Sequence, residues 1–244
     1  MTISVGTSGW QYRDWRGRFY PEGLPNASWL GHYAGRFGIV EVNASFYRLP
    51  ERSTVERWAA TVPPTFVFVF KASRYLTHIR RLRDPEEPLR RMYGVLEGAG
   101  GKLGPVLFQL PPTLRRDDGL LRAFLERLPR EPRSAFEFRH ASWFADEVLE
   151  ALDASGAALV HADRPGVRVE VPTAGGWSYL RFHQGARAGP RYRRAKLRAY
   201  AEAIARVGAR DVFAFFNNDT AGAAVLDAAT LIELLEARRV RVVA

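Results

Sequence analysis

Apolar residues alternate with polar ones in short segments along the chain, and polar residues gather toward the end of each segment. The stretch from Ala135 to Phe144 shows this most clearly. Successive side chains of a strand alternate faces, so Glu137 and Arg139 share one face. Phe136 and Phe138 share the other. An acid and a base on an inward face suit a closed barrel, whose outer face packs on helices and whose inner face lines a pocket at the carboxyl ends of the strands.

The same alternation predicts eight strands, most of them followed by a helix. The predicted strands are Ile3 to Thr7, Ile39 to Asn43, Phe66 to Lys71, Val106 to Gln109, the stretch that begins at Ala135, Ala158 to Asp163, Tyr179 to His183 and Val212 to Phe216. The predicted helices lie near Ser28 to Phe37, Thr54 to Ala60, Leu120 to Leu128, Asp146 to Ser155, Arg191 to Val207 and Ala221 to Ala237, and within Pro85 to Gly98.

The segment from Arg164 to Trp177 interrupts this order, because its two Pro and three Gly offer no clear helix. Eight predicted strands in 244 residues, seven of them followed by a predicted helix, are typical of a closed barrel of parallel strands. The sequence therefore predicts an α/β protein with a single (β/α)8 TIM-barrel domain over residues 1–244 and an irregular segment in place of the helix after the sixth strand.

Polar residues at the late end of nearly every predicted strand indicate where a site would form. They are the pairs Glu41 and Asn43, Glu137 and Arg139, His161 and Asp163, and Arg181 and His183, together with Lys71, Gln109, Asn217 and Asn218. In an open sheet such groups would cluster at one switch point, whereas in a barrel all strand ends converge on one centre. Burying unpaired charges costs several kcal/mol, so this many ionic groups favour a functional pocket over a purely structural interior.

Composition narrows the class of protein. Hydrophobic residues make up 47% of the chain without low-complexity tracts, which indicates a globular protein. No run approaches 18 apolar residues and the first residues lack a signal-peptide pattern, so we expect no membrane association and a cytoplasmic location. The absence of Cys excludes disulfides, thiolate nucleophiles and Cys-ligated metals. Phosphate-binding and dinucleotide-binding glycine motifs are also absent.

The formal charge of +10 raises the question of a nucleic-acid partner. Of the 36 basic residues only Lys71, Lys102 and Lys196 are lysines, which leaves 33 arginines. Such an imbalance also arises from a compositional bias of the genome, and basic runs usually lie on solvated surfaces. A nucleic-acid partner therefore remains an open alternative.

Several motifs in a fixed order resemble the YecE-like family, a domain of unknown function with a TIM-barrel fold, along nearly the whole chain. They are Gly6-Thr7-Ser8-Gly9-Trp10, Val40-Glu41-Val42-Asn43 with Ser45-Phe46-Tyr47, Gln109-Leu110-Pro111-Pro112, Glu137-Phe138-Arg139-His140 with Ser142-Trp143, Tyr179-Leu180-Arg181-Phe182-His183 and Phe216-Asn217-Asn218-Asp219. The resemblance implies the barrel and no established reaction. The chain departs from the family at His183-Gln184-Gly185, where His is more often followed directly by Gly.

The residue types suit acid/base chemistry, hydrolysis or proton transfer, on a phosphorylated or carboxylated small molecule without a cofactor. The predicted catalytic residues are Glu41 or Glu137 as general base, His140 or His183 as acid, and Asp163. Lys71, Arg139 and Arg181 are predicted to bind the anion. The aromatic residues Trp10, Tyr12, Tyr47 and Trp143 are candidates for stacking on the substrate, and Asn43, Gln109, Asn217, Asn218 and Asp219 for polar contacts with it.

Two alternatives and the oligomeric state stay open at this stage. Metal-dependent phosphodiester cleavage would use a divalent ion held by His161, Asp163, Glu137, His183 and Asp219. The chain lacks the usual His-x-His spacing, and the neighbouring cations would repel the ion. The other alternative is a non-catalytic protein that binds an anionic metabolite or RNA at the same mouth.

Overall fold

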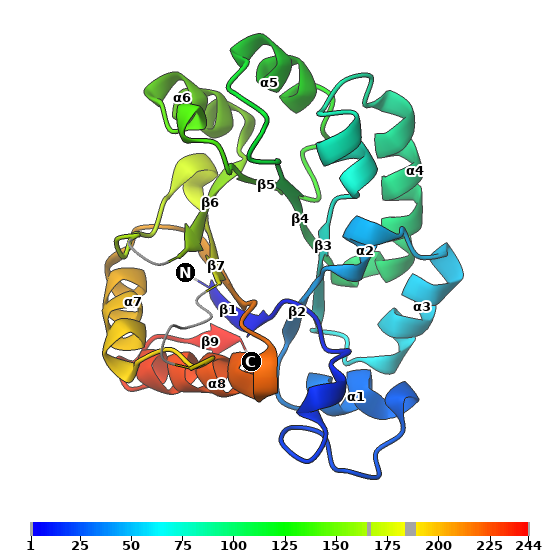
Figure 1. The fold of residues 1–244 in the computed structure, drawn as a ribbon, viewed down its shortest axis with the longest axis vertical. Coiled ribbons are helices and arrows are strands. Elements are labelled where there is room, and N and C mark those ends of the chain that lie inside the picture. Colours follow the sequence, from blue (N-terminus) through cyan, green and yellow to red (C-terminus); the bar gives the residue numbers. More distant parts are fainter. Residues whose placement is uncertain (1, 165–166, 184–188, 244) are drawn as a thin grey trace.

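Eight parallel strands close into a barrel in the computed structural model, which describes residues 2–164, 167–183 and 189–243 (Figure 1). The strands are β1 (Thr2–Thr7), β2 (Ile39–Val42), β3 (Val67–Lys71), β4 (Leu103–Gln109), β5 (Ser134–Glu137), β6 (Ala158–Asp163), β7 (Ser178–Phe182) and β8 (Asp211–Phe216). β1 pairs with β8 along its length and with β2 at Thr7, which closes the sheet. A two-residue strand, β9 (Val242–Val243), pairs with the early part of β1.

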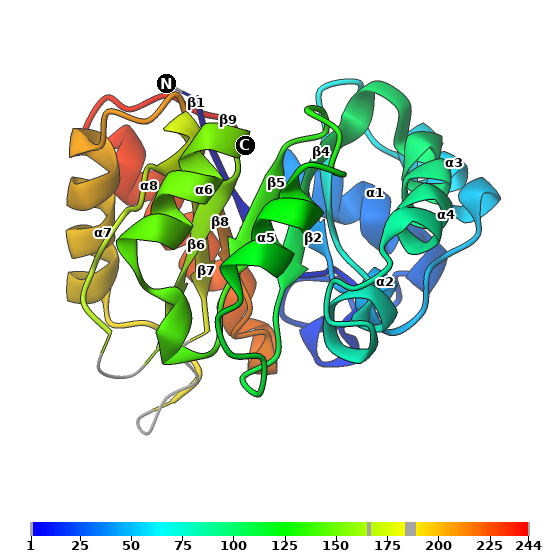
Figure 2. The same ribbon diagram turned by 90° about the horizontal axis from the view of Figure 1, so that it is seen from above.

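Helices surround the barrel, and both chain ends lie at one end of it (Figure 2). They are α1 (Trp29–Ala34), α2 (Ala44–Tyr47), α3 (Arg52–Thr61), α4 (Glu86–Leu96), α5 (Asp118–Leu125), α6 (Asp146–Ser155), α7 (Arg194–Arg206) and α8 (Ala223–Glu236). In the described part of the segment between β6 and β7 the only helical turn is a 3-10 turn at Ala174–Gly176. The predicted TIM barrel with an irregular segment after the sixth strand is therefore confirmed.

Two hydrophobic clusters follow from the alternation of faces along the strands. The smaller one fills the barrel interior with side chains such as Val69, Leu107 and Val160. The larger one lies between the outer face of the sheet and the helices and includes Phe68, Phe136 and Phe182. The same alternation that separates these clusters decides which polar residues at the strand ends point inward.

Gly6 allows β1 to approach β2 closely at the point of closure. A Cβ atom at this position would lie 2.3 Å from the carbonyl oxygen of Ile39. No real Cβ reaches that distance, so any other residue would push the two strands apart. Glycine at position 6 is therefore a condition for closing the barrel.

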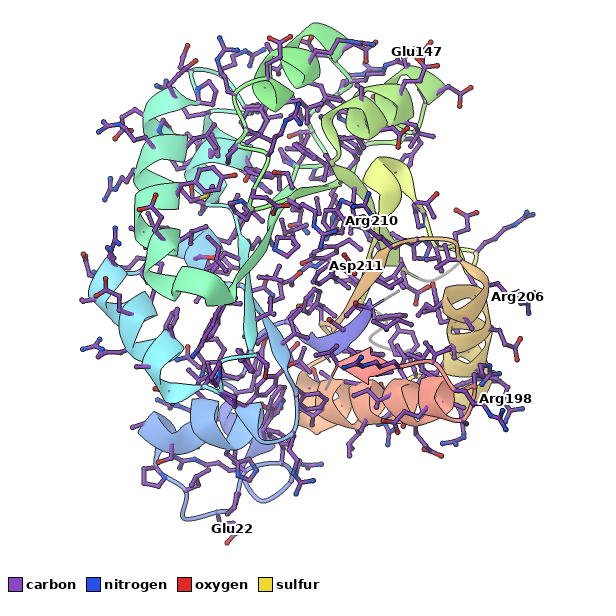
Figure 3. The ribbon with its side chains drawn as sticks, turned by 180° about the vertical axis from the view of Figure 1, so that it is seen from behind. Glu22, Glu147, Arg198, Arg206, Arg210 and Asp211 are labelled. Carbon is purple, nitrogen blue, oxygen red and sulfur yellow. The ribbon has the colours of Figure 1, made fainter. Side chains whose placement is uncertain are left out.

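An ion pair and two aromatic rings block the amino-terminal end of the barrel. Arg133 Nη1 lies 3.0 Å from Asp211 Oδ2, and the guanidinium of Arg133 lies 4.6 Å from the centre of the Trp177 ring and 5.4 Å from that of Phe213. Asp211 and its neighbour Arg210 lie near the middle of this end in Figure 3. The barrel interior is thus covered on this side, and a ligand would enter from the carboxyl ends of the strands.

The strand and helix predictions differ from the structure mainly at their boundaries. Ala44–Tyr47, which lies outside the predicted strands and helices, forms α2, and Tyr75–Ile79 forms a π-helical turn that the pattern did not indicate. Across the described residues, no helix combines the length and the apolarity that a membrane span requires.

Candidate functional site

Arg181 lies at the centre of a polar layer that covers the apolar barrel interior. It follows Tyr179 on the inward face of β7 and is 1% exposed. Its guanidinium reaches across the barrel to the carboxylates of Glu41 on β2 and Glu137 on β5. The inward direction predicted for these three residues is therefore confirmed.

Glu41 binds one edge of the Arg181 guanidinium through both of its carboxylate oxygens. Arg181 Nη2 donates to Glu41 Oε1 at 2.7 Å, and Arg181 Nε donates to Glu41 Oε2 at 3.0 Å. The hydroxyl of Tyr179 donates to Oε2 at 2.6 Å. Paired hydrogen bonds of this kind are the strongest that arginine forms with a carboxylate, so they fix the plane of the guanidinium.

Glu137 binds the other edge of Arg181 and two further arginines. Its Oε2 accepts from Arg181 Nη1 at 2.6 Å and from Gln109 Nε2 at 2.9 Å. Its Oε1 lies 2.5 Å from Arg139 Nη2 and 3.3 Å from Arg164 Nη2. Glu137 is fully buried and joins side chains of four strand ends into one network.

Both carboxylates are held in the charged form. Burial alone would raise their pKa values, but the charge of Arg181 and the hydrogen bonds outweigh it, so the pKa of Glu41 and that of Glu137 lie below their usual range. The same carboxylates raise the pKa of Arg181. Each of the four carboxylate oxygens already has two donor atoms of neighbouring side chains within hydrogen-bond distance.

We call Glu41, Lys71, Glu137, Arg139, Arg164 and Arg181 the mouth cluster. It contains four cationic side chains and two carboxylates. The side chains of Arg139 and Arg164 are 25% and 36% exposed, so they form the rim of the cluster. The Nε of Arg139 is buried and has no hydrogen-bond partner in the described structure.

His183 follows Arg181 on the same face and joins the cluster to the end of β8. Its Nδ1 lies 2.9 Å from Asn217 Nδ2, and its Nε2 lies 3.8 Å from Glu137 Oε1. Asn43 Nδ2 donates to Asn217 Oδ1 at 3.3 Å. Burial and the charge of Arg181 lower the pKa of His183 to about 4, so the ring is neutral at pH 7.

Two concavities lie away from this cluster. Volumes of about 780 and 820 Å³ open at the amino-terminal side of the barrel, and both are lined by Leu128, Pro129 and Glu131. Neither is lined by a member of the mouth cluster. The ionic groups, rather than these volumes, define the candidate site.

Asp163 and His161 do not join the mouth cluster, so the prediction that this pair points inward is wrong. Asp163 accepts from the hydroxyls of Tyr192 at 2.7 Å and Tyr200 at 2.8 Å and pairs with Lys196 at 2.8 Å. His161 Nε2 lies 2.8 Å from the hydroxyl of Tyr200. Tyr200 and Lys196 belong to α7, so the outer face of β6 carries the polar pair and the inner face carries Ala158 and Val160.

The candidate aromatic residues lie in different environments. Trp143 is 1% exposed, stacks on Phe138 and donates its indole N–H to the carbonyl of Leu114 at 2.8 Å. Trp10 is 4% exposed and packs against Trp58, so both tryptophans fill the core. Tyr47 is 76% exposed, which leaves its ring at the surface.

Tyr12 and Asp219 lie beside the mouth cluster. The hydroxyl of Tyr12 donates to the carbonyl of Ser8 at 2.5 Å, and burial and the charge of Asp219 raise its pKa. Burial also raises the pKa of Asp219, whose main-chain carbonyl accepts from the indole of Trp15.

The last two candidates have local structural partners. His140 Nδ1 lies 2.8 Å from the hydroxyl of Ser142 and 3.1 Å from its main-chain nitrogen, so it begins the 3-10 turn at Ala141–Trp143. Asn218 Nδ2 donates to Asp227 Oδ2 on α8 at 2.8 Å. Neither is linked to the mouth cluster by a hydrogen bond among the described residues.

The proposed metal ligands are not all brought together, although His183 Nε2 lies 3.8 Å from Glu137 Oε1. His161 and Asp163 lie on the outer face of β6, and Glu137 is surrounded by arginines. Among residues 2–164, 167–183 and 189–243, no group of three or more His, Asp or Glu side chains is arranged to hold a metal ion.

Sequence reasoning missed Arg164, Tyr179 and Ser8. Arg164 would have followed from the correct alternation of β6, in which Ala158, Val160 and Ala162 precede it on the inward face. Tyr179 precedes Arg181 by two positions and shares its face. Ser8 is 1% exposed, and its side chain contributes to the lowered pKa of Glu41. The departure at Gln184 and Gly185 lies outside the described residues.

A parallel (β/α)8 barrel with a buried ionic cluster at the carboxyl ends of its strands defines a TIM-barrel protein with a polar mouth. Residues 4–244 match the family described as "Protein of unknown function DUF72", and the chain belongs to that family. It is 27% identical to the UPF0759 protein YunF of Bacillus subtilis (strain 168), over 96% of this chain and 95% of YunF.

Two solved structures of the same family share the fold. A DUF72 family protein of Thermotoga maritima has a TM-score of 0.84 and 28% identity, with 97% of this chain and 100% of that chain covered. A DUF72 family protein of Enterococcus faecalis has a TM-score of 0.73 and 22% identity, with 96% and 98% covered. The barrel expected from the sequence is confirmed, and the family of unknown function that these comparisons show is DUF72.

Proposed function

We propose that this protein binds an anionic small molecule, phosphorylated or carboxylated, at the barrel mouth and carries out acid/base chemistry on it, hydrolysis or proton transfer. The charge of the mouth cluster supports this proposal. Its two carboxylates already accept hydrogen bonds at every oxygen, so they cannot accept further ones from the rim arginines. The remaining N–H groups of these arginines are therefore left for a ligand. We also propose that this protein belongs to the narrower YecE-like family.

The rim geometry suits an anion for two reasons. Arg139 and Arg164 come from neighbouring strand ends and each uses only one terminal nitrogen on Glu137. Their remaining N–H groups are suited to the paired oxygens of a phosphate or carboxylate. The cations also surround a low-dielectric mouth, which concentrates anions near the site.

We assign the carboxylates a different role from the general base predicted from the sequence. Glu41 and Glu137 have lowered pKa values and occupied oxygens, so they are weak proton acceptors and act as positioning residues for Arg181, Arg139 and Arg164. Lys71 is better placed to move protons at neutral pH. His183 is neutral, and burial lowers the pKa of Lys71 to about 8.

Calorimetry at low ionic strength with glycerol 3-phosphate and glycerol tests the binding proposal. These ligands share a carbon skeleton and differ in the phosphate, so we expect binding of the first only. Arg164→Gln removes charged hydrogen bonds, which are worth about 1.5 to 3 kcal/mol, and should weaken binding roughly ten- to hundredfold. The control is Arg198→Gln, an exposed residue of α7 that lies at the periphery in Figure 3.

Equal binding of the two ligands, or equal losses in the two variants, would contradict the proposal. Turnover separates an enzyme from a binder. Phosphorylated and carboxylated metabolites that stabilise the protein are to be assayed for hydrolysis and for exchange of carbon-bound hydrogen in deuterated water. Stabilisation without either reaction would favour the non-catalytic alternative.

A further inference from the structure

Lysine is rare in this chain, and two of its three lysines have structural partners. Lys102 donates to the carbonyls of Ala59 and Val62, the latter at 2.7 Å, at the end of α3. Lys196 pairs with Asp163 on the outer face of β6. Both therefore hold elements of the barrel together.

Lys71 has no such partner and lies in the mouth. It is the last residue of β3, it is 8% exposed, and its Nζ lies 4.1 Å from the centre of the Phe46 ring. No hydrogen bond or ion pair of this Nζ is present among the described residues. The ring of Phe46 holds the amine in place, while the charged neighbours of the mouth cluster are engaged with the carboxylates.

Arginine would supply a positive charge here equally well, and it outnumbers lysine 33 to 3 in this chain. What an arginine cannot supply is a neutral amine, because its guanidinium stays protonated in proteins. A lone lysine among arginines at the mouth therefore indicates a need for a nucleophile rather than for charge.

We propose that Lys71 is a catalytic nucleophile whose amine forms an imine with an aldehyde or ketone that carries a phosphate or carboxylate. This inference rests on the proposed function and specifies its substrate class. Arg139 and Arg164 bind the anionic group, and the carbonyl carbon meets Nζ.

The step is balanced without a further reactant. The nitrogen of the neutral amine attacks the carbonyl carbon, a C–N bond forms, and a proton moves from nitrogen to the carbonyl oxygen. The C–O bond then breaks, the hydroxyl leaves as water together with the second proton of the nitrogen, and the C=N bond forms. The imine withdraws electrons from the neighbouring carbon, which makes its proton easier to remove. This fits the proton-transfer chemistry proposed for the mouth.

Electrostatics support a reactive amine at this position. Burial, followed by the charge of Arg181, lowers the pKa of Lys71 to about 8, while Glu41 and Glu137 act in the opposite direction and Arg139 adds to the lowering. About a tenth of the amines are then neutral at pH 7, compared with well under a thousandth for an ordinary lysine. The rate of adduct formation should rise as the pH passes through about 8.

Borohydride trapping on the full chain tests the inference. The protein is incubated with glyoxylate or glycolaldehyde phosphate and then with sodium borohydride, which reduces an imine to a stable amine. Peptide mass spectrometry then locates the label among the three lysines. We expect one reduced adduct on Lys71, at least tenfold less on Lys102 and Lys196, and suppression by inorganic phosphate. Uncharged glycolaldehyde should label Lys71 much less.

Variants separate this inference from the proposed function. Lys71→Arg should abolish the adduct and still bind glycolaldehyde phosphate in calorimetry, whereas Lys196→Arg should keep the adduct on Lys71. Binding of glycolaldehyde phosphate without an adduct would overturn the imine and leave the proposed function standing. Absence of both would overturn both proposals. Equal labelling of all three lysines, or labelling that phosphate does not suppress, would also overturn the inference.

Discussion

At the scale of single residues, the stability of the mouth depends on Arg181. It satisfies both oxygens of Glu41 and one oxygen of Glu137, and all three side chains are almost completely buried. Removing one partner of a buried ion pair leaves an uncompensated charge, which costs about 3 to 5 kcal/mol. The charge of this one side chain therefore permits two carboxylates inside a barrel.

We predict that Arg181→Met lowers the free energy of unfolding by about 3 to 5 kcal/mol at pH 7 and reverses its dependence on pH. In the original chain the pKa of Glu41 is lowered, so its contribution is present above the ordinary pKa and is lost as the pH falls. Without Arg181, burial raises that pKa, and the variant gains stability as the pH falls. Urea unfolding between pH 4 and 8 measures both slopes.

A more conservative variant keeps the prediction testable if the Arg181→Met protein does not fold. Tyr179→Phe removes the hydroxyl that donates to Glu41 and keeps the ring that packs on Phe213 and Phe215. It should cost about 1.5 to 3 kcal/mol and leave the direction of the pH dependence unchanged. Parallel pH profiles for Arg181→Met and the original chain would show that Arg181 does not control the ionisation of Glu41.

At the scale of elements, β6 separates structural from functional side chains between two adjacent residues. Asp163 points outward to Tyr192, Tyr200 and Lys196, whereas Arg164 reaches Glu137 at the mouth. Successive residues of a strand face opposite sides, so these two adjacent residues have different roles, Asp163 in the packing of α7 and Arg164 at the mouth.

We predict opposite effects for substitutions at these two positions. Asp163→Asn weakens the pair with Lys196 and should lower the free energy of unfolding by about 1 to 3 kcal/mol, with unchanged affinity for glycerol 3-phosphate. Arg164→Gln should lower that affinity and lower stability by no more than about 1 kcal/mol, because Arg164 is partly exposed and Glu137 keeps its pairs with Arg181 and Arg139. Denaturation and calorimetry on both variants measure the two effects. If Asp163→Asn reduces affinity as much as Arg164→Gln, the assignment of faces on β6 is incorrect.

Polarity alone predicted the inward positions of Glu41, Glu137 and Arg181 correctly, and β6 shows why its face was predicted wrongly. Glu41 on β2, Glu137 on β5 and Arg181 on β7 do point inward. They do so because both carboxylates pair with the guanidinium of Arg181 at the mouth. On β6 the polar pair points outward, because tyrosines of α7 and of the segment before it supply hydrogen bonds there. The partners come from residues some 30 to 40 positions later, which no local pattern reveals.

Aromatic residues were ambiguous for a similar reason. Trp143 lies next to a predicted site motif, yet its indole N–H donates to the carbonyl of Leu114 and its ring stacks on Phe138. A buried tryptophan needs one hydrogen-bond acceptor, and either the core or a ligand can provide it. Only the packing of helices against the barrel decides between the two.

At the scale of the whole molecule, the two ends of the barrel have different tasks. The amino-terminal end is blocked by Arg133, which pairs with Asp211 and covers Trp177. The opposite end contains the mouth cluster, where cations exceed carboxylates. This division agrees with TIM barrels in general, in which the amino-terminal end contributes to stability and the carboxyl-terminal end contains the active site.

We therefore predict that Arg133→Ala affects stability without affecting the site. It removes a partly exposed ion pair and the contact with the Trp177 ring, which together should cost about 1 to 2 kcal/mol. Arg139→Gln, at the other end, should weaken glycerol 3-phosphate binding roughly tenfold or more, because it removes charged hydrogen bonds to the anion. Calorimetry on both variants compares the affinities, and thermal unfolding compares the stabilities. Because the apolar side chains of the barrel interior separate the two ends, an Arg133→Ala protein that lost affinity as far as Arg139→Gln would place the ligand outside the mouth.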